Sequence, residues 1–331
     1  MIRRRKFMAL LGGAVAAWPL AARAEQPERM RRVGVLHGLA ESDPQVASRV
    51  AAFQRGLREL GWTEGRNIRL DYHWAGADLS HVQAHAKELV ATAPDALLAS
   101  STPVLAALQQ ETRTIPIVFV LVMDPVGQGF VPNLAYPDGN ITGFTNFESA
   151  IAGKWLEMLK ETEPGIARVG FLYNPDTAPY FGVYQRSLKE AASTFDVDAV
   201  DLRVHDAVQI ERAINGWAVG SKTGIIVLPD ITTTRHLELI IDLAGRHRLP
   251  AVYPFRYFAT SGGLMYYGID LLEHYRSAAS YIDRILRGTK PSDLPVQAPT
   301  KYELVINLKA AKALGLTMPP TLLVRADEVI E

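Results

Sequence analysis

Cysteine is absent from the 331 residues of the chain. A chain without cysteine forms no disulfide bond, offers no thiol nucleophile and lacks the ligands of an iron–sulfur cluster or a Cys-type zinc site. An excess of charge of one sign is also absent, because 35 basic residues stand against 35 acidic ones. Nucleic-acid-binding proteins usually carry a basic face, so this class is not expected.

What the chain has is the composition of a globular protein, with 48% hydrophobic and 21% charged residues. This balance argues against disorder, collagen-like repeats and coiled coil. A chain of this length usually folds into two domains, each large enough to bury its own core.

The first 24 residues contain five basic side chains and no acidic one. Basic residues form the run Arg3–Lys6, an apolar stretch follows over Phe7–Ala22, and the sequence up to Ala24 ends in a small–x–small pattern. These features predict a secretory signal peptide over residues 1–24, cleaved after Ala24. The apolar stretch is shorter than a membrane span of about 20 residues, and an uncleaved membrane anchor is the alternative. The basic start fits both the Sec and the twin-arginine export routes, so the choice between them stays open.

Cleavage would leave 30 basic residues against 35 acidic ones, since five of the 35 basic residues lie in the leader. No cysteine is present to carry a lipid anchor. We therefore expect a mildly acidic, exported protein that diffuses freely in the periplasm.

Short apolar segments alternate with helical patterns along the chain. The run Val33–His37 predicts a buried parallel strand, and the spacing of apolar residues over Val46–Leu60 predicts a helix. The alternation pauses at Pro132–Phe147, which is rich in Pro, Gly and Asn, and starts again at Arg168. Strands that alternate with helices predict a parallel sheet covered on both faces. The expected fold class is therefore α/β, with two doubly wound parallel-sheet lobes in tandem.

The loops after the strands hold the candidate binding residues, because open α/β sheets bind ligands beyond the carboxyl ends of their strands. Ser101 and Thr102 follow a predicted strand and open a helix, where free amides and the helix dipole favour an anion. A simple N-cap is the alternative, although a cap needs only one hydroxyl. Three aspartates are candidates either for a ligand ammonium or for turn and cap roles: Asp124, Asp230 and Asp270.

Motifs of enzymes and metal sites are weak in this chain. The sequence contains no G-x-S-x-G elbow, no H-E-x-x-H and no G-x-G-x-x-G after a strand. His81 and His85 stand four residues apart on a predicted helix without a third ligand in view. We therefore expect a solvated helix face there, no metal, no cofactor and no catalytic residue.

Several stretches carry a resemblance to a known family. They are Met8–Gly13, Trp18–Ala24, Thr114–Phe119, Asp124–Gly127, Gly139–Phe144, Tyr281–Gly288 and Lys301–Lys309. In these stretches the chain resembles the substrate-binding proteins of ABC transporters, in the TrpX-like (ABC_sub_bind) group. The resemblance extends over nearly the whole chain.

The resemblance implies a type I periplasmic binding protein, in which two α/β lobes joined by three crossover segments enclose a small solute. The crossovers would lie near Ile141–Phe147, Gly263–Ile269 and Pro291–Val305. Family members usually have a small hydroxyl residue where this chain has Tyr266. If its ring faces the cleft, the pocket is smaller or more aromatic than in relatives.

The crossovers imply a division of the chain between the lobes. Lobe 1 would comprise residues 25–143 and 268–290, and lobe 2 residues 144–267 and 291–331. The helix Leu271–Arg287 would then belong to the first lobe and the C-terminal segment to the second.

For an amino-acid-like solute or an aromatic acid, the loop positions suggest a division of roles. We expect Ser101 and Thr102 to bind the carboxylate. Asp230 or Asp124 would bind the ammonium, and Asn174 lies in another of these loops. The aromatic residues expected to cover an apolar part of the ligand are Tyr180, Phe181, Tyr253 and Tyr267.

The implied function is that of the solute-binding component of an ABC importer, which closes about a hinge and delivers its ligand to a permease in the inner membrane. The expected partners are a small-molecule ligand and that permease, and the protein itself is expected to be a monomer. Two alternatives remain open: a ligand-binding sensor subunit of a membrane receptor, and an exported enzyme on a two-lobe α/β scaffold.

Overall fold

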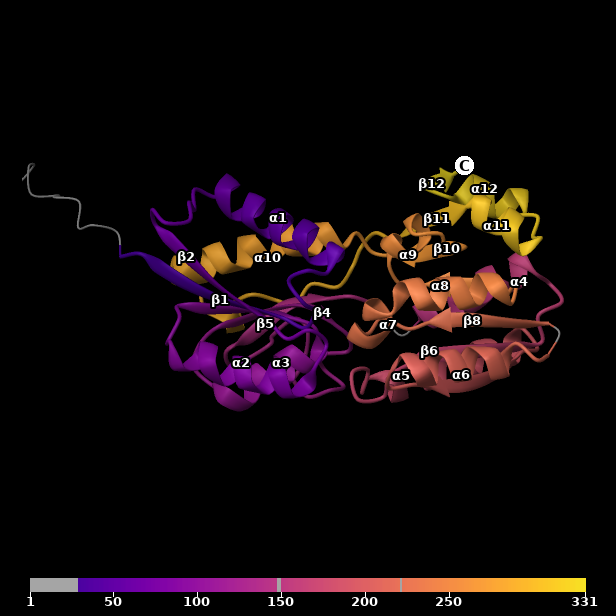
Figure 1. Cartoon of the computed structure of the whole chain (residues 1–331). Helices are drawn as coiled ribbons and strands as arrows, with labels where there is room; N and C mark the ends of the chain where they lie inside the picture. Colours follow the sequence, from indigo (N-terminus) through magenta and orange to yellow (C-terminus); the bar gives the residue numbers. More distant parts are fainter. Residues whose placement is uncertain (1–28, 148–149, 221) are drawn as a thin grey trace, which may run out of the picture.

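The computed structural model describes residues 29–147, 150–220 and 222–331, so the predicted signal peptide over residues 1–24 lies outside the described residues. Two lobes lie side by side along the long axis of the molecule (Figure 1). No helix in the described part of the chain is long and apolar enough to cross a membrane.

The first lobe is built on a five-stranded parallel sheet in the order β2-β1-β3-β4-β5. Its strands are β1 (Arg31–His37), β2 (Ile68–Trp74), β3 (Ala96–Ser100), β4 (Ile117–Val122) and β5 (Ile141–Thr145). One face is covered by α1 (Pro44–Glu59) and α10 (Leu271–Leu286), and the other by α2 (Leu79–Ala91) and α3 (Thr102–Glu111) (Figure 1).

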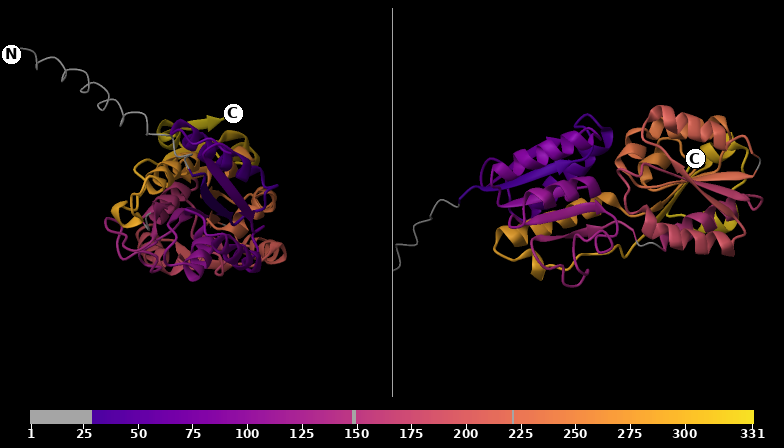
Figure 2. Two further views of the ribbon diagram at one scale, coloured as in Figure 1. Left: turned by 90° about the vertical axis from the view of Figure 1, so that its left-hand side faces the viewer. Right: turned by 90° about the horizontal axis from the view of Figure 1, so that it is seen from below.

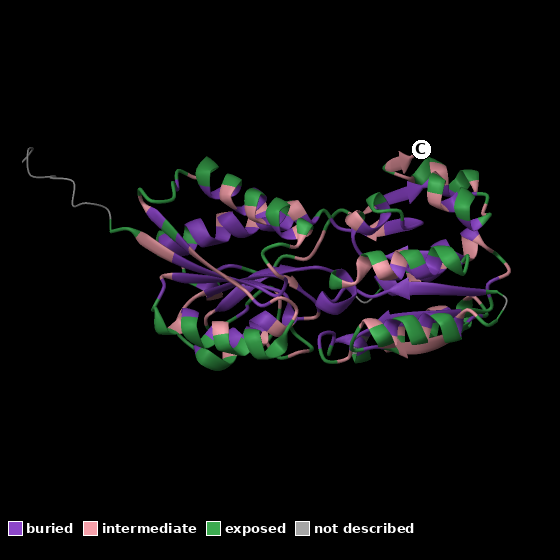
Figure 3. Ribbon diagram, viewed as in Figure 1, coloured by how far each residue is buried: buried purple, intermediate pink, exposed green. Residues whose placement is uncertain are grey.

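Strand β1 illustrates why both faces of this sheet are covered. Val33 and Val35 pack beneath α1 and α10, whereas Leu36 packs beneath α2 and α3. Because successive strand residues point to opposite faces, an uninterrupted apolar run buries both of them (Figure 3). On the first face, α1 and α10 approach closely at Gly56, where an added Cβ would lie 2.8 Å from Cβ of Ala279.

The second lobe is built on a seven-stranded sheet in the order β12-β11-β10-β9-β8-β6-β7. Its strands are β6 (Arg168–Tyr173), β7 (Asp198–Arg203), β8 (Thr223–Val227), β9 (Ala251–Tyr253), β10 (Met265–Gly268), β11 (Glu303–Asn307) and β12 (Glu328–Ile330). Its helices are α4 (Ile151–Thr162), α5 (Phe181–Thr194), α6 (Ala207–Trp217), α7 (Ile231–Arg235), α8 (Leu237–Arg246), α9 (Arg256–Thr260), α11 (Leu308–Leu314) and α12 (Pro320–Arg325). Helices again lie on both faces of the sheet (Figure 2).

Three segments connect the lobes: the chain leaves the first sheet after β5, returns after β10 to form α10, and leaves again before β11. The first and third connections run side by side, because Gln297 N donates to the carbonyl of Gly143 at 2.9 Å and its carbonyl accepts from Thr145 N at 2.9 Å. Gly143 has φ +155°, and a Cβ there would lie 2.2 Å from the carbonyl oxygen of Phe119. Only glycine lets β5 pair with β4 at this point. The predicted fold class, two parallel-sheet α/β lobes with three crossovers, is confirmed.

Some local predictions differ from the structure. Strand β11 runs antiparallel to β10, whereas fully parallel lobes were expected. After β8 the chain forms two short helices, α7 and α8, which meet at His236. Helix α10 packs against α1 in the first lobe, and Leu294 and Val296 also pack there. Gln297 still pairs with Phe144 of β5, so the third connection remains on the first lobe as far as Gln297.

Candidate functional site

A cavity lies between the lobes, at the carboxyl ends of strands from both sheets, and we call it the interlobe cavity. Its volume is about 30 Å³, room for about two water molecules. Parallel strands place their following loops at this edge, which is where open α/β sheets bind ligands. It is lined by Gly38, Leu39, Arg49, Ser100, Ser101, Thr102, Pro103, Leu121 and Asn146 of the first lobe, and by Thr177, Tyr180, Pro229, Asp230, Ile231, Thr234 and Phe255 of the second.

Two hydroxyl groups of the first lobe face this cavity at the N-terminus of α3. The side chains of Ser101 and Thr102 are buried, and neither hydroxyl oxygen has a hydrogen-bond partner among the described residues. Ser101 precedes the helix as its N-cap residue but makes no side-chain cap bond. Its backbone has φ +128° and ψ +162°, a conformation that ordinarily only glycine adopts. The simple N-cap role therefore does not account for Ser101.

A buried guanidinium lies in the same wall of the cavity. Arg49 on α1 is only 4% exposed. Its Nη2 donates to the hydroxyl of Tyr257, on α9 of the other lobe, at 3.3 Å. Arg49 makes no ion pair within the described part of the chain, although an arginine stays protonated and buried charges are usually paired. Tyr257, Tyr275 and Asp43 interact favourably with the guanidinium, but no carboxylate among the described residues is in direct contact with it. A buried cation of this kind has an unfilled place for an anion.

Two hydrogen-bond acceptors also line the cavity, one from each lobe. Asn146, directly after β5, is 1% exposed, and its Oδ1 has no hydrogen-bond partner among the described residues. Asp230 follows β8 and is 7% exposed. Its carboxylate accepts from Thr233 N at 2.8 Å and Asn174 N at 3.2 Å, and also from Thr177 Oγ1 at 3.3 Å. These bonds hold the carboxylate in place and cap α7.

The electrostatics of Asp230 follow from its burial. Desolvation penalises the charged carboxylate and raises its pKa from 3.8 to about 6, although the bonds from Thr233, Asn174 and Thr177 oppose this shift. At neutral pH the carboxylate is ionised but poorly solvated, which makes it a strong acceptor for a cationic donor. The cavity thus combines an anion-binding wall with an acceptor pair.

Of the residues singled out in the sequence, four line the interlobe cavity. They are Ser101, Thr102, Tyr180 and Asp230. The hydroxyl of Tyr180 donates to the carbonyl of Pro229, so the ring, and not the hydroxyl, is free to contact a ligand. Asn174 lies behind Asp230, where its Nδ2 also donates to Thr232 Oγ1 at 2.9 Å. It positions the carboxylate from outside the cavity.

The remaining aspartates named in the sequence analysis lie away from the cavity. Asp124 Oδ1 accepts from Gly127 N at 3.0 Å within the turn after β4. Asp270 accepts from Leu272 N at 2.8 Å and is the exposed N-cap of α10. Both have the turn or cap role that was their alternative, and neither lines the interlobe cavity. Asp270 lines a neighbouring pocket of about 330 Å³ that shares Arg49 with this cavity.

The remaining aromatic residues also pack elsewhere. Tyr253 is 1% exposed and stacks on Phe258 in the second lobe, with 5.0 Å between ring centroids. Phe181 likewise stacks on its neighbour Tyr173 at 4.1 Å. Both rings belong to the apolar core of the second lobe.

The tyrosine pair in β10 does not reach the cavity. Tyr267 stacks on Tyr302, with 5.6 Å between ring centroids. Tyr266 is fully buried, and its hydroxyl donates to the carbonyl of Ile269 at 2.6 Å. The tyrosine that replaces the family's usual small hydroxyl residue therefore does not narrow the interlobe cavity.

Five polar residues of the cavity were not named as candidates from the sequence: Arg49, Ser100, Asn146, Thr177 and Thr234. A signal for Arg49 was present, because it lies three residues after Val46 and four before Phe53, on the apolar face of α1. An arginine on the buried face of an amphipathic helix is unusual, because a buried arginine is normally paired with another group. Asn146 and Thr177 lie in loops that carry no comparable signal.

A family model described as "ABC transporter substrate binding protein" matches residues 33–330. The chain belongs to this family. Its members are solute-binding proteins and not enzymes, and their two-lobe arrangement is that of type I periplasmic binding proteins.

Three relatives of this substrate-binding protein are informative. It is 27% identical over 273 residues to a tyrosine-binding protein of Clostridioides difficile, covering 82% of this chain and 78% of the other. It is similar, at 25% identity and a TM-score of 0.83, to a Streptococcus pneumoniae domain solved in complex with L-Trp, covering 91% of this chain and 99% of that one. It is also similar to the ligand-free, open structure of a substrate-binding protein with adhesive properties from Clostridium difficile, at 26% identity, a TM-score of 0.66 and the same coverage.

Proposed function

We propose that the protein is the periplasmic substrate-binding component of an ABC importer and captures an amino acid in the interlobe cavity. The observation that carries the proposal is the pairing of opposite chemistries in one cavity. Arg49, Ser101 and Thr102 offer a cation and two unpartnered hydroxyls, and Asn146 and Asp230 offer acceptors. A zwitterionic amino acid carries both complements, a carboxylate and an ammonium, on one carbon atom.

The donors are suited to the α-carboxylate. The guanidinium of Arg49 supplies the charge, and the hydroxyls of Ser101 and Thr102 supply hydrogen bonds beside the N-terminus of α3. The ammonium then donates to Asp230 Oδ and to Asn146 Oδ1. The side-chain oxygens of Ser101, Thr102 and Asn146, which lack a partner, each gain one. This removes a desolvation cost of about 1–3 kcal/mol per group.

The apolar lining supports an amino acid with an aromatic or large aliphatic side chain. Leu39, Leu121 and Ile231 contribute aliphatic surface, and Tyr180 and Phe255 contribute rings. Ring faces in an apolar pocket favour an aromatic ligand. The relatives named for tyrosine and solved with L-Trp agree with this choice.

Capture requires the lobes to separate and close again, because the cavity is smaller than an amino acid. Among the described residues, contacts across the lobes include the packing of Ile231 against Leu39 and Val46. Arg49 Nη2 donates to the hydroxyl of Tyr257 at 3.3 Å, and Arg235 Nη1 donates to the carbonyl of Gly76 at 3.0 Å. The arrangement is more similar to the L-Trp complex than to the ligand-free open structure, at nearly equal identity. The ligand stabilises the closed form by its higher affinity for that form, and the closed form is what a permease of the inner membrane would recognise.

The test is a thermal-shift screen of the protein after denaturation and refolding, which strips any solute carried through purification. A ligand at about 100 times its dissociation constant adds roughly 2.7 kcal/mol, a shift of several degrees. We expect L-tyrosine, L-tryptophan or L-phenylalanine to give the largest shift. Tyramine, which lacks the carboxylate, and 3-(4-hydroxyphenyl)propionate, which lacks the amine, should give little or none. A hit confined to sugars or to analogues without a zwitterion would refute the proposal.

Ser101 offers a second test, because its hydroxyl and its backbone conformation are separable. Ser101→Ala removes the hydroxyl and keeps the unfavourable φ, whereas Ser101→Gly removes both. We expect each variant to bind about tenfold or more weakly, since a hydrogen bond to a charged group contributes about 1.5–3 kcal/mol. Ser101→Gly should be more stable than Ser101→Ala by about 1–3 kcal/mol, the cost of such a backbone conformation. Calorimetric titration measures the first effect and chemical denaturation the second; unchanged affinity in both variants would remove Ser101 from the site.

A further inference from the structure

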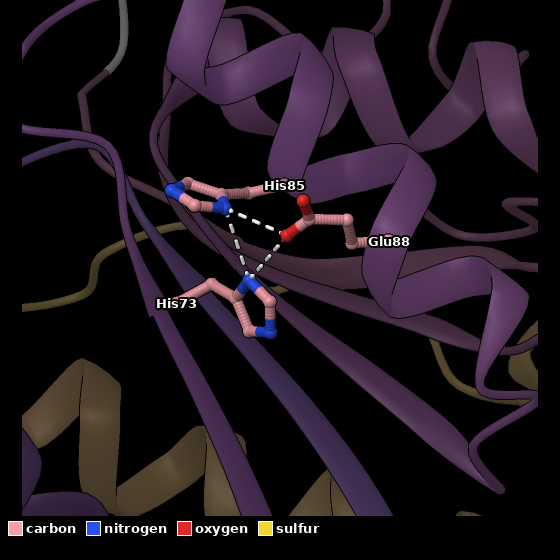
Figure 4. A group of neighbouring side chains, drawn as sticks. All are labelled: His73, His85 and Glu88. Atoms are coloured by element: carbon pink, nitrogen blue, oxygen red, sulfur yellow. Dashed lines mark hydrogen bonds and ion pairs between the residues drawn. The ribbon is translucent and has the colours of Figure 1, made fainter.

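A second cluster of polar side chains lies in the first lobe, outside the interlobe cavity. His73 projects from β2, and His85 and Glu88 project toward it from α2 (Figure 4). The two Nδ1 atoms are 3.1 Å apart, Glu88 Oε2 is 3.1 Å from the Nδ1 of His85, and it is 3.5 Å from the Nδ1 of His73. None of the three residues lines the interlobe cavity. The sequence had shown only His81 and His85, without a third ligand. In the fold, His73 and Glu88 lie beside His85, and His81 is not part of the cluster.

These separations are those of a coordination tetrahedron. Zinc binds imidazole nitrogen and carboxylate oxygen at about 2.0–2.1 Å, so two ligand atoms at a tetrahedral angle lie about 3.4 Å apart. The three donor atoms are already at 3.1, 3.1 and 3.5 Å from one another. The three donor atoms therefore have the separations that a single tetrahedral ion requires of its ligands.

The Nδ1 atom of His85 has two close neighbours, the Nδ1 of His73 and the Oε2 of Glu88, both at 3.1 Å. A proton on this nitrogen can be directed at only one of them, whereas an ion can bind all three atoms. The side chains of His73, His85 and Glu88 are 25%, 30% and 62% exposed, so an ion can enter from solvent and keep water in its fourth position. Two imidazoles and one carboxylate with an open position form a donor set that zinc favours.

We propose that His73, His85 and Glu88 form a binding site for one divalent zinc ion. The bound ion would join β2 to α2. The apolar cluster that holds α2 on the sheet, through residues such as Val82 and Ala86, contains no residue of β2. Because the ion binds the folded lobe and not the unfolded chain, it would raise the thermal stability of the protein.

The experiment uses the purified protein without a histidine tag, treated with EDTA and dialysed into metal-free buffer. Isothermal titration with zinc chloride should give saturable binding of one ion per chain and a rise in melting temperature. Cobalt in place of zinc should give the visible absorption of a tetrahedral site.

Three variants decide whether the binding belongs to this cluster. His85→Ala, on an exposed helix where alanine is favourable, should weaken zinc binding by about 100-fold or more, because even indirect partners of metal ligands contribute 10–100-fold. Glu88→Gln keeps the shape and removes the charge, and it should also weaken binding. His205→Ala is the matched control, since His205 pairs with a carboxylate, Asp176, at 2.9 Å on the other lobe; its zinc affinity should equal that of the unmodified protein. Absence of saturable binding, or binding that survives His85→Ala, overturns the proposal.

Discussion

Arg49→Met should abolish capture of the amino acid while leaving the protein folded. Arg49 is the buried cation of the interlobe cavity and lacks an ion pair among the described residues, so the proposed carboxylate of the ligand is its partner. Removing one member of a desolvated charge pair costs about 2–5 kcal/mol of binding free energy, a loss of about 30-fold or more in affinity. Isothermal titration with the best amino acid of the screen measures this loss.

The same substitution should not destabilise the unliganded protein. A buried charge without a partner carries a desolvation cost, and a hydrophobic residue of similar volume is often neutral or stabilising in its place. Tyr257 loses the bond from Arg49 but retains its contact with Thr234 Oγ1 at 3.1 Å. We therefore expect the melting temperature of unliganded Arg49→Met to equal or exceed that of the unmodified protein.

Arg55→Met is the matched control, because Arg55 lies on the exposed face of the same helix. It removes one positive charge from α1 at a distance from the cavity, so it reports the effect of net charge alone. Its affinity should be that of the unmodified protein. Equal affinities for Arg49→Met and Arg55→Met would show that the guanidinium does not hold the ligand.

Much of the fold is predictable because its elements carry strong local signals. The segment Val33–His37, apolar up to Leu36, forms most of β1, and the apolar spacing from Val46 onward forms α1, capped by Asp43. Such patterns depend only on which side chains must be buried, which the sequence states directly. The pairing of β11 with β10 is different, because an antiparallel neighbour is chosen by where the third crossover delivers the chain and not by a pattern inside Glu303–Asn307.

The site is less predictable than the fold, because its residues are brought together by tertiary structure. Ser101 and Asp230 were found since each follows a buried strand, and the same reasoning also selected Asp124, which forms a turn. A residue that follows a strand lies at the correct edge of the sheet, but its place in the sequence does not show where its side chain points. Arg49 enters the cavity from the middle of a helix, so a search confined to loops could not reach it.

Ligand affinity should fall as the pH is lowered through the pKa of Asp230. Burial raises that pKa to about 6 in the free protein, so the carboxylate is ionised at neutral pH and largely protonated at lower pH. A protonated carboxyl does not attract the ammonium, and at about pH 5 only about one molecule in ten is ionised, so affinity falls about tenfold. Titrations at a series of pH values measure the slope.

Other groups near the cavity do not explain such a slope. The pKa of His37 is lowered to about 3, by burial first and by the charge of Arg49 second, so His37 stays neutral over this interval. The amino and carboxyl groups of a free amino acid also keep their charges there. Asp230→Asn should therefore bind more weakly at neutral pH and show no pH dependence over the same range.

Stability should change with pH in the opposite direction. The folded pKa of Asp230 lies above its unfolded value of 3.8, so the folded protein takes up a proton more readily than the unfolded chain. The contribution of this group to the free energy of unfolding thus rises as the pH falls from neutrality through about 6 toward 4, by up to about 3 kcal/mol. Unliganded Asp230→Asn should lack this rise, because asparagine still caps α7 but does not titrate.

The two pH effects together separate a binding role of Asp230 from a purely structural one. A carboxylate that only caps α7 would give the stability change without the affinity change. A carboxylate that holds the ammonium gives both, with opposite signs, because the ligand needs the ionised form and the unliganded fold favours the protonated one. Affinity that is flat across this range, in a protein whose stability still rises on acidification, would assign Asp230 to the helix cap and leave the ammonium to Asn146.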